Sequence, residues 1–158
     1  MSSELLDEVD RGILYLLQKD ARNHTAADIA EHVDVTANTV RNRIRRLESR
    51  DVINGYVPRI DYEQAGYQLE VDMICTATIN ERSTLANEAL DVDGVVHVRE
   101  RMTGRENVIV TGIAAESDDL TTIASHLDEI GLTVEGEELV KNDYVQPFDR
   151  FGLDATEE

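Results

Sequence analysis

The spacing of the apolar residues changes near residue 69 of this 158-residue chain. Before residue 50, apolar side chains recur every three or four positions, as Val40, Ile44 and Leu47 do, which is the spacing of one face of an α-helix. Between residues 69 and 79 they alternate with mostly polar residues, as in a strand with one buried face. The chain is therefore predicted to be an α+β protein in which a helical part precedes a part built on a sheet.

The segment 36–50 carries a clear helix start. Thr36 is a good N-cap, and Val35 before it can pack against Val40 as a hydrophobic staple. The face opposite the apolar stripe carries amides and guanidiniums, which can hydrogen-bond base edges and phosphates in a DNA major groove. A solvated charged helix face is the alternative explanation for this pattern.

Two further helices are predicted ahead of this segment. Residues 5–20 form a scaffold helix, and Thr25 with Asp28 makes a capping box for a short second helix. Asp34 lies in the following turn, where it tolerates the left-handed conformation better than most residues. This arrangement predicts a helix-turn-helix whose second helix enters the major groove. The predicted DNA-binding residues are Thr36 at the helix start, Asn38, Asn42 and Arg45 for base edges, and Arg41, Arg46 and Arg50 for phosphates.

The net charge of −18 is distributed unevenly along the chain. Residues 1–60 have a net charge of −1 and residues 61–158 one of −17, while segment 36–50 alone has +4. This local excess of positive charge is compact, as contacts to DNA phosphates require. One arginine of the segment, Arg43, lies beside the apolar stripe and is expected to pair with an acid of the first helix. Excess carboxylate with only two lysines, Lys19 and Lys141, resembles adaptation to concentrated cytoplasmic salt, so a haloarchaeal source is expected.

The second part of the chain is predicted to have the order βαββαβ. The strands are expected at residues 69–79, 95–102, 107–114 and 132–144, and the helices at 83–90 and 117–130, capped by Ser83 and Ser117. This order is typical of a ferredoxin-like domain, an antiparallel sheet with both helices on one side. The isoleucines Ile74, Ile109 and Ile113 fall on the other side, which predicts a dimer formed by two facing sheets. Cys75, the only cysteine, is expected to be a small buried strand residue.

These patterns predict that the chain is divided into four segments. Residues 1–54 are the helix-turn-helix domain, and 55–67 are a hinge or linker strand that Pro58 restricts to a sheet edge. Residues 68–146 are the ferredoxin-like effector and oligomerisation domain, and 147–158 are an acidic tail, expected to fray at its end. Arg59 in the linker is a candidate contact to the DNA backbone.

Several short sequence motifs, taken together in this order, resemble those of the leucine-responsive and asparagine-regulator (Lrp/AsnC) family of prokaryotic transcription regulators. They are Leu6-Asp7-x-x-Asp10, the segment 43–48, the motif Val52-Ile53-Asn54-Gly55-Tyr56, Asp61 with Gly66-Tyr67, and Thr103-Gly104 before an apolar strand. The resemblance covers residues 5 to about 144. It implies a winged-type helix-turn-helix followed by an ACT/RAM-like domain that dimerises and often assembles into tetramers or octamers. It also implies a small effector, usually an amino acid, bound where dimers meet.

The resemblance also assigns an effector site. Its residues in this chain are Thr103, Gly104, Arg105, Glu106 and Asn107, with Glu135 and Glu137 from the last strand. Asn107 stands where the family usually has an aspartate, and Glu135 or Glu137 stands near its usual threonine or serine. An acidic lining of this kind would favour a basic ligand such as lysine or arginine.

Two other functions remain open at this level. Siroheme decarboxylase subunits resemble this family in fold, but no catalytic residue, cofactor or metal site is predicted here. The histidines His24, His32, His97 and His126 have no metal-ligand spacing. His97, Arg99 and Arg101 share a strand face that could hold a carboxylate, although one-sided polar strands are common. The other alternative is an architectural oligomer that coats DNA with little sequence preference. Because the sequence has no signal peptide or membrane-span pattern, a cytoplasmic protein without a membrane partner is expected.

Overall fold

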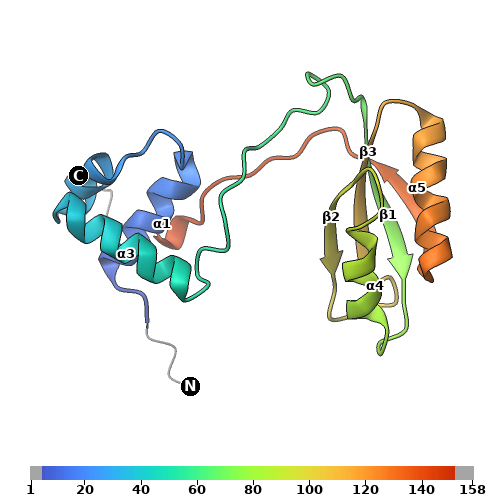
Figure 1. Cartoon of the computed structure of the whole chain (residues 1–158), viewed down its shortest axis with the longest axis horizontal. Helices are drawn as coiled ribbons and strands as arrows, with labels where there is room; N and C mark the ends of the chain where they lie inside the picture. Colours follow the sequence, from blue (N-terminus) through green and yellow to red (C-terminus); the bar gives the residue numbers. More distant parts are fainter. Residues whose placement is uncertain (1–4, 152–158) are drawn as a thin grey trace. The chain divides into compact units, whose positions relative to one another are not determined.

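The computed structural model describes residues 5–151, which form two compact units. One unit comprises the described residues up to Pro58 together with those from Tyr144 onwards, and the other comprises Arg59–Asp143 (Figure 1). None of the helices in the described part combines the length and the apolar character that a bilayer crossing demands.

The first unit contains three helices, α1 (Glu8–Asp20), α2 (Ala26–Val33) and α3 (Ala37–Ser49). Their inward faces share one core, whose fully buried members include Ile13, Ile29, Val40 and Leu47. The predicted helix-turn-helix is therefore present. The helix expected at residues 5–20 begins three residues later, because Asp7 caps it and forms a capping box with Asp10.

The remaining helix ends in this unit follow the predicted local chemistry. Thr25 and Asp28 form a capping box at α2, and Thr36 caps α3. Asp34 ends α2 in the left-handed conformation, with φ 52°, as predicted. Asp51 adopts the same conformation directly after α3, with φ 56°. Both positions are places where helices commonly turn back through a left-handed residue.

The second unit is a four-stranded antiparallel sheet with two helices, in the predicted order. Its elements are β1 (Leu69–Thr76), α4 (Arg82–Ala89), β2 (Val95–Glu100), β3 (Val108–Ala114), α5 (Ser117–Ile130) and β4 (Thr133–Leu139). The strands lie in the order β2-β3-β1-β4, as expected for a ferredoxin-like domain. One sheet face and the two helices bury a common core that includes Met73, Val110 and Leu127.

Cys75 belongs to this core, as predicted. Burial, together with the nearby carboxylate of Glu135, raises the pKa of its thiol to about 12. A thiol with this pKa stays protonated near neutral pH. Cys75 is therefore a packing residue.

Several predicted boundaries in the second unit are wrong. The first strand ends at Thr76, and Ile79 beyond it is exposed, because the chain turns there. The other strands are also shorter than expected. Ser83 does not cap α4, because the helix begins at Arg82 and Glu81 occupies the N-cap position, and α5 is capped by Glu116, one residue before Ser117.

Two peripheral segments flank the sheet unit in the sequence. No strand forms in residues 55–67, because this part of the chain, which includes exposed Val57, has no neighbouring strand to pair with. The acidic tail is expected to fray only at its end, and its start forms a short 3-10 helix, η1 (Asp149–Phe151), which packs against the helical unit. The rest of the tail, 152–158, lies outside the described residues.

Candidate nucleic-acid interface

The outer face of α3 presents the predicted DNA-binding side chains. Six of the seven are exposed: Thr36 at the N-cap, and Asn38, Arg41, Asn42, Arg45 and Arg46 on the helix. Asn38, Asn42 and Arg45 follow one another at spacings of four and three residues, so they lie on one stripe of the helix. The stripe opposes the buried Val40 and Leu47. The helix therefore offers amide and guanidinium donors outward over about two turns.

The two ends of α3 are fixed by local hydrogen bonds. The Thr36 hydroxyl accepts from the Thr39 N–H at 3.1 Å, so Thr36 is exposed but its oxygen serves as a helix cap. At the other end, the Arg50 N–H donates to the Arg46 carbonyl at 3.0 Å. The Arg50 side chain is half-buried, unlike the other arginines predicted to contact DNA.

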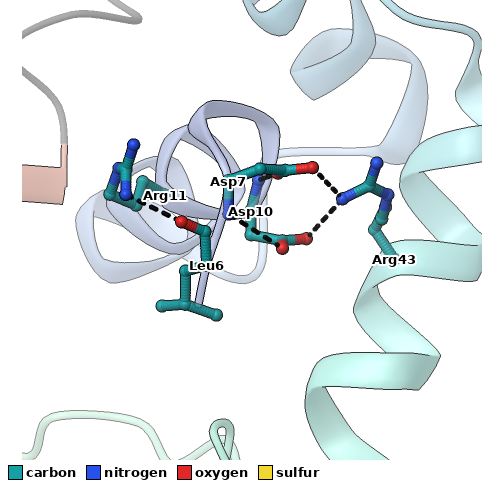
Figure 2. A network of polar contacts seen from close by, with 5 residues as sticks. All are labelled: Leu6, Asp7, Asp10, Arg11 and Arg43. Carbon is teal, nitrogen blue, oxygen red and sulfur yellow. Dashed lines mark hydrogen bonds and ion pairs between the residues drawn. The ribbon is translucent and has the colours of Figure 1, made fainter. Parts of the chain in front are cut away.

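An ion-pair cluster joins α3 to the start of α1 (Figure 2). Arg43 Nη1 donates to Asp7 and, at 3.1 Å, to Oδ1 of Asp10. The other Asp10 oxygen accepts from the Asp7 N–H at 3.3 Å. The Asp10 side chain is only 2% exposed, whereas that of Arg43 is 27% exposed. The predicted pairing of Arg43 with an acid of the first helix is therefore confirmed.

The electrostatics of this cluster favour charged Asp7. Partial burial opposes its ionisation, but the Asp10 N–H and the Arg43 guanidinium together hold the pKa of Asp7 below its usual value. The hydrogen bond to Asp7 in turn raises the pKa of Arg43. Arg43 therefore sets how α3 is held against α1, while its neighbours along α3 face outward.

Arg59, a candidate DNA contact, lies in the second unit. Its Nη2 donates to the Asp143 carbonyl at 3.4 Å, so it joins two segments at the boundary of the sheet unit.

The predicted effector loop lies between β2 and β3. Residues 101–106 are all exposed, and Gly104 has φ 93°, a left-handed conformation that favours glycine. Thr103, Arg105 and Glu106 therefore face solvent in this unit.

Asn107 differs from the rest of the loop because it is only 4% exposed and fully engaged with the backbone. Its Oδ1 accepts from the Ala77 N–H at 2.9 Å, and its Nδ2 donates to the Ala77 carbonyl at 2.9 Å. Its own N–H donates to the Cys75 carbonyl at 3.0 Å. The amide thus extends the pairing of β1 and β3 beyond the last strand residue. Sequence reasoning missed this role; asparagine in place of the family's usual aspartate was the available signal.

The other end of the loop is held by α4. Arg82 Nε and the Ser83 hydroxyl each donate to Oε1 of Glu100 at 2.7 Å, and Arg82 Nη1 reaches the Met102 carbonyl at 3.4 Å. The Ser83 hydroxyl, followed by Arg82, lowers the pKa of Glu100.

The charged strand residues singled out in the sequence are separated by the sheet. Glu135 and Glu137 belong to β4, whereas His97 and Arg99 belong to β2, and these are the two outer strands. β3 and β1 lie between them. Within one unit, therefore, the acidic pair and the basic residues do not form one site.

Comparison with known sequences identifies relatives of the chain. A family described as "Winged helix-turn-helix DNA-binding" matches residues 6–54. The HTH-type transcriptional regulator LrpA of Pyrococcus horikoshii is 30% identical over 122 residues, which cover 77% of this chain and 85% of that protein. An uncharacterized HTH-type transcriptional regulator of Pyrococcus abyssi is 39% identical over 69 residues, 44% of this chain. This match spans only 46% of the Pyrococcus abyssi protein, and similar relatives from two other Pyrococcus species are matched over 43% of their length.

Solved structures share the fold. The leucine response regulatory protein of Mycobacterium tuberculosis superposes with a TM-score of 0.76 at 22% identity, covering 89% of this chain and 96% of that chain. A feast or famine regulatory protein of the same organism, complexed with L-methionine, gives 0.76 at 23% identity and covers 90% and 96% of the two chains. These likenesses confirm the three-helix unit followed by a βαββαβ sheet unit.

Proposed function

Because the chain belongs to the Lrp/AsnC family of transcription regulators, we propose that it binds double-stranded DNA in a sequence-specific manner and regulates transcription. The observation that carries this proposal is the outer face of α3, where exposed amides and guanidiniums lie opposite a buried stripe. The relatives described above are named as transcription regulators and not as enzymes, so the decarboxylase alternative has no support among them.

In the proposed complex, α3 lies in the major groove. Asn38, Asn42 and Arg45 contact base edges, because amides and guanidiniums can make bidentate hydrogen bonds to adenine and guanine. Arg41 and Arg46 on the flanks contact phosphates, which orient the helix without reading sequence. The Arg43 pair with Asp7 and Asp10 keeps the helix at a fixed angle to α1.

A pair of substitutions on α3 tests this assignment. Asn42→Ala is expected to lower affinity for the preferred site by about 1–3 kcal/mol and to leave random DNA almost unaffected, because it removes a base contact. Arg41→Ala is expected to weaken both equally and to reduce the salt dependence, because it removes a phosphate contact. Fluorescence anisotropy on both DNAs over a salt series measures the two effects. Equal binding by the wild type to specific and random DNA would instead support an architectural role.

The acidic composition suggests where this regulator works. With a net charge of −18 and two lysines, the protein is suited to the cytoplasm of a haloarchaeon. At molar salt the Debye length is about 3 Å, so phosphate attraction contributes less to binding. Base contacts and DNA deformation then carry a larger share of the affinity.

The second part of the proposal is a homodimer formed through the open face of the sheet. That face carries Ile74, Ile109 and Ile113, opposite the helix-covered core. Of the charged residues on this face, His97 and Arg99 lie on the outer strand β2, Glu138 lies on the outer strand β4, and Glu70 and Asp72 lie on the central strand β1. A twofold axis parallel to the strands would set the basic edge of one copy against the acidic edge of its partner. A dimer would also present two copies of α3 to a palindromic site.

Substitution of the half-buried Ile74 tests the dimer. Ile74→Glu is expected to weaken dimerisation at least tenfold, because it places a carboxylate beside the apolar Ile109, the residue that pairs with Ile74 across β1 and β3. Leu90→Glu is the matched control, since Leu90 follows α4 and is exposed. Sedimentation velocity gives the oligomeric state. A monomeric wild type, or a dimer that Ile74→Glu leaves unchanged, would contradict this interface.

The third part is a small-molecule effector, such as an amino acid, at the exposed loop 103–106. Support comes from relatives of the same fold whose structures contain L-methionine. Asn107 would act as support for this loop, because its amide is already engaged with Ala77. The DNA-binding assay, repeated with and without L-methionine, lysine and arginine, tests this part; no change with any of them would remove these three as effectors.

A further inference from the structure

The C-terminal segment 144–151 belongs to the helical unit, although it follows the sheet unit in sequence. Figure 1 shows its orange-red trace ending beside α1, and η1 lies against that helix. Phe151 is half-buried and packs on the core that includes Ile13 and Val40. The segment is therefore part of the fold of the helix-turn-helix unit.

Specific contacts hold this segment in place. The Phe148 N–H donates to Oε1 of Gln18 on α1 at 3.2 Å. The rings of Phe148 and Phe151 meet edge to face, with centroids 4.9 Å apart and an angle of 89°. Aromatic pairs favour this geometry because the positive ring edge meets the negative ring face. The chain has only two phenylalanines, and both lie here.

The chain passes between the two units a second time just before this segment. The Val140 N–H donates to the Glu70 carbonyl at 2.8 Å, which continues the sheet past β4, and Asp143 accepts from Arg59. The chain thus enters the sheet unit at residue 59 and leaves it after residue 143.

We propose that residues 144–151 form a C-terminal brace that positions α1, and through α1 the DNA-contacting helix α3. The brace contacts Gln18 near the end of α1, while Asp7 and Asp10 at its start hold Arg43 of α3. Phe148 and Phe151 are positioning residues in this arrangement. The part concerning DNA rests on the proposed function.

Hydrogen exchange of the full chain tests the brace. Phe151→Ala is expected to speed amide exchange in α1 and α3 roughly tenfold and to leave β1 and β3 unchanged, because only the helical unit loses a packing contact. Phe151→Leu should restore most of the protection. Tyr144→Ala is the matched control, because this aromatic residue of the same segment is 85% exposed. Gln18→Ala is a milder variant that removes the acceptor of the Phe148 N–H.

DNA binding provides the second measurement. At a temperature where all variants are folded, Phe151→Ala is expected to bind DNA about three- to tenfold more weakly than Tyr144→Ala, with Phe151→Leu close to wild type. Equal exchange and equal DNA affinity for Phe151→Ala and Tyr144→Ala would overturn the brace. Weaker DNA binding by Phe151→Ala without altered exchange in α1 would also overturn it. If the wild type binds no DNA, the proposed function fails, and hydrogen exchange still decides the brace.

Discussion

Replacement of Arg43 by alanine is expected to lower the free energy of unfolding of the helical unit by about 3 kcal/mol. The variant leaves the Asp10 carboxylate, 2% exposed, without the cation that lies 3.1 Å from it in the wild type. A buried charge that loses its partner costs more than the pair itself contributes, because its desolvation is no longer compensated. Urea unfolding followed by far-UV circular dichroism, with hydrogen exchange to assign the loss to α1 and α3, measures this change.

Two further variants separate this effect from a general loss of charge. Arg41→Ala removes an exposed guanidinium from the same helix and should change stability by less than about 0.5 kcal/mol. Asp10→Asn combined with Arg43→Ala should recover much of the loss, because the amide leaves no uncompensated charge. A single Arg43→Ala variant as stable as Arg41→Ala would show that the cluster does not hold the two helices together.

The stabilising effect of the cluster should also depend on pH. The pKa of Asp7 is lowered from its ordinary value of 3.8. Its contribution is therefore present above about pH 4 and is lost as the pH falls through the lower, folded-state pKa. The stability difference between wild type and Arg43→Ala should accordingly narrow below pH 4. Because Asp7 is half exposed, solvent screening limits how much its ion pair with Arg43 contributes to stability.

The helical unit was predictable wherever local chemistry decides the structure. Thr25 with Asp28, Thr36 and Asp34 act at helix ends within a few residues of their partners, so their roles can be inferred from sequence alone. The spacing of the apolar residues likewise predicts which face of α3 points outward. The position of Arg43 beside the apolar stripe predicts its pairing with the first helix, but it does not identify Asp7 and Asp10 as the two acceptors.

The sequence-based predictions are wrong where a side chain or backbone group contacts a residue that lies far away in the sequence. Ser83 has the chemistry of a helix cap, but α4 begins one residue before it, and its hydroxyl donates to Glu100, seventeen residues away. Nothing local in the segment that contains Phe148 indicates that it returns to Gln18, 130 residues earlier. Such contacts depend on tertiary packing, which local propensity does not encode.

Asn107 is a third such case, and Asn107→Asp tests its role. Both polar atoms of the Asn107 amide are hydrogen-bonded, since Oδ1 accepts from the Ala77 N–H and Nδ2 donates to the Ala77 carbonyl. An ionised carboxyl at this position keeps the first bond but places negative oxygen against that carbonyl. We expect the sheet unit to lose about 2–3 kcal/mol at pH 7, because a buried charge meets an acceptor in place of a donor. Hydrogen exchange in β1 and β3 measures the loss.

The dependence of this loss on pH distinguishes the amide's pairing from simple packing. Burial and the facing carbonyl are expected to raise the pKa of the introduced carboxyl above its unfolded value of about 3.9. A group whose folded-state pKa is raised in this way destabilises the protein above that pKa, and the stability returns as the pH falls through it. Once protonated, the carboxyl can donate to the Ala77 carbonyl and accept from the Ala77 N–H, as the amide does. Asn107→Asp should therefore regain much of its stability near pH 4.

Asn107→Ala is the control, because it removes both hydrogen bonds and introduces no titrating group. Its stability loss relative to the wild type should stay constant between pH 7 and pH 4, and at pH 4 it should exceed the loss caused by Asn107→Asp. A loss in Asn107→Asp that stays the same over this range would mean that the carboxyl rotates into solvent. The loss would then come only from the missing hydrogen bonds to the Ala77 backbone, with no charge buried against the Ala77 carbonyl.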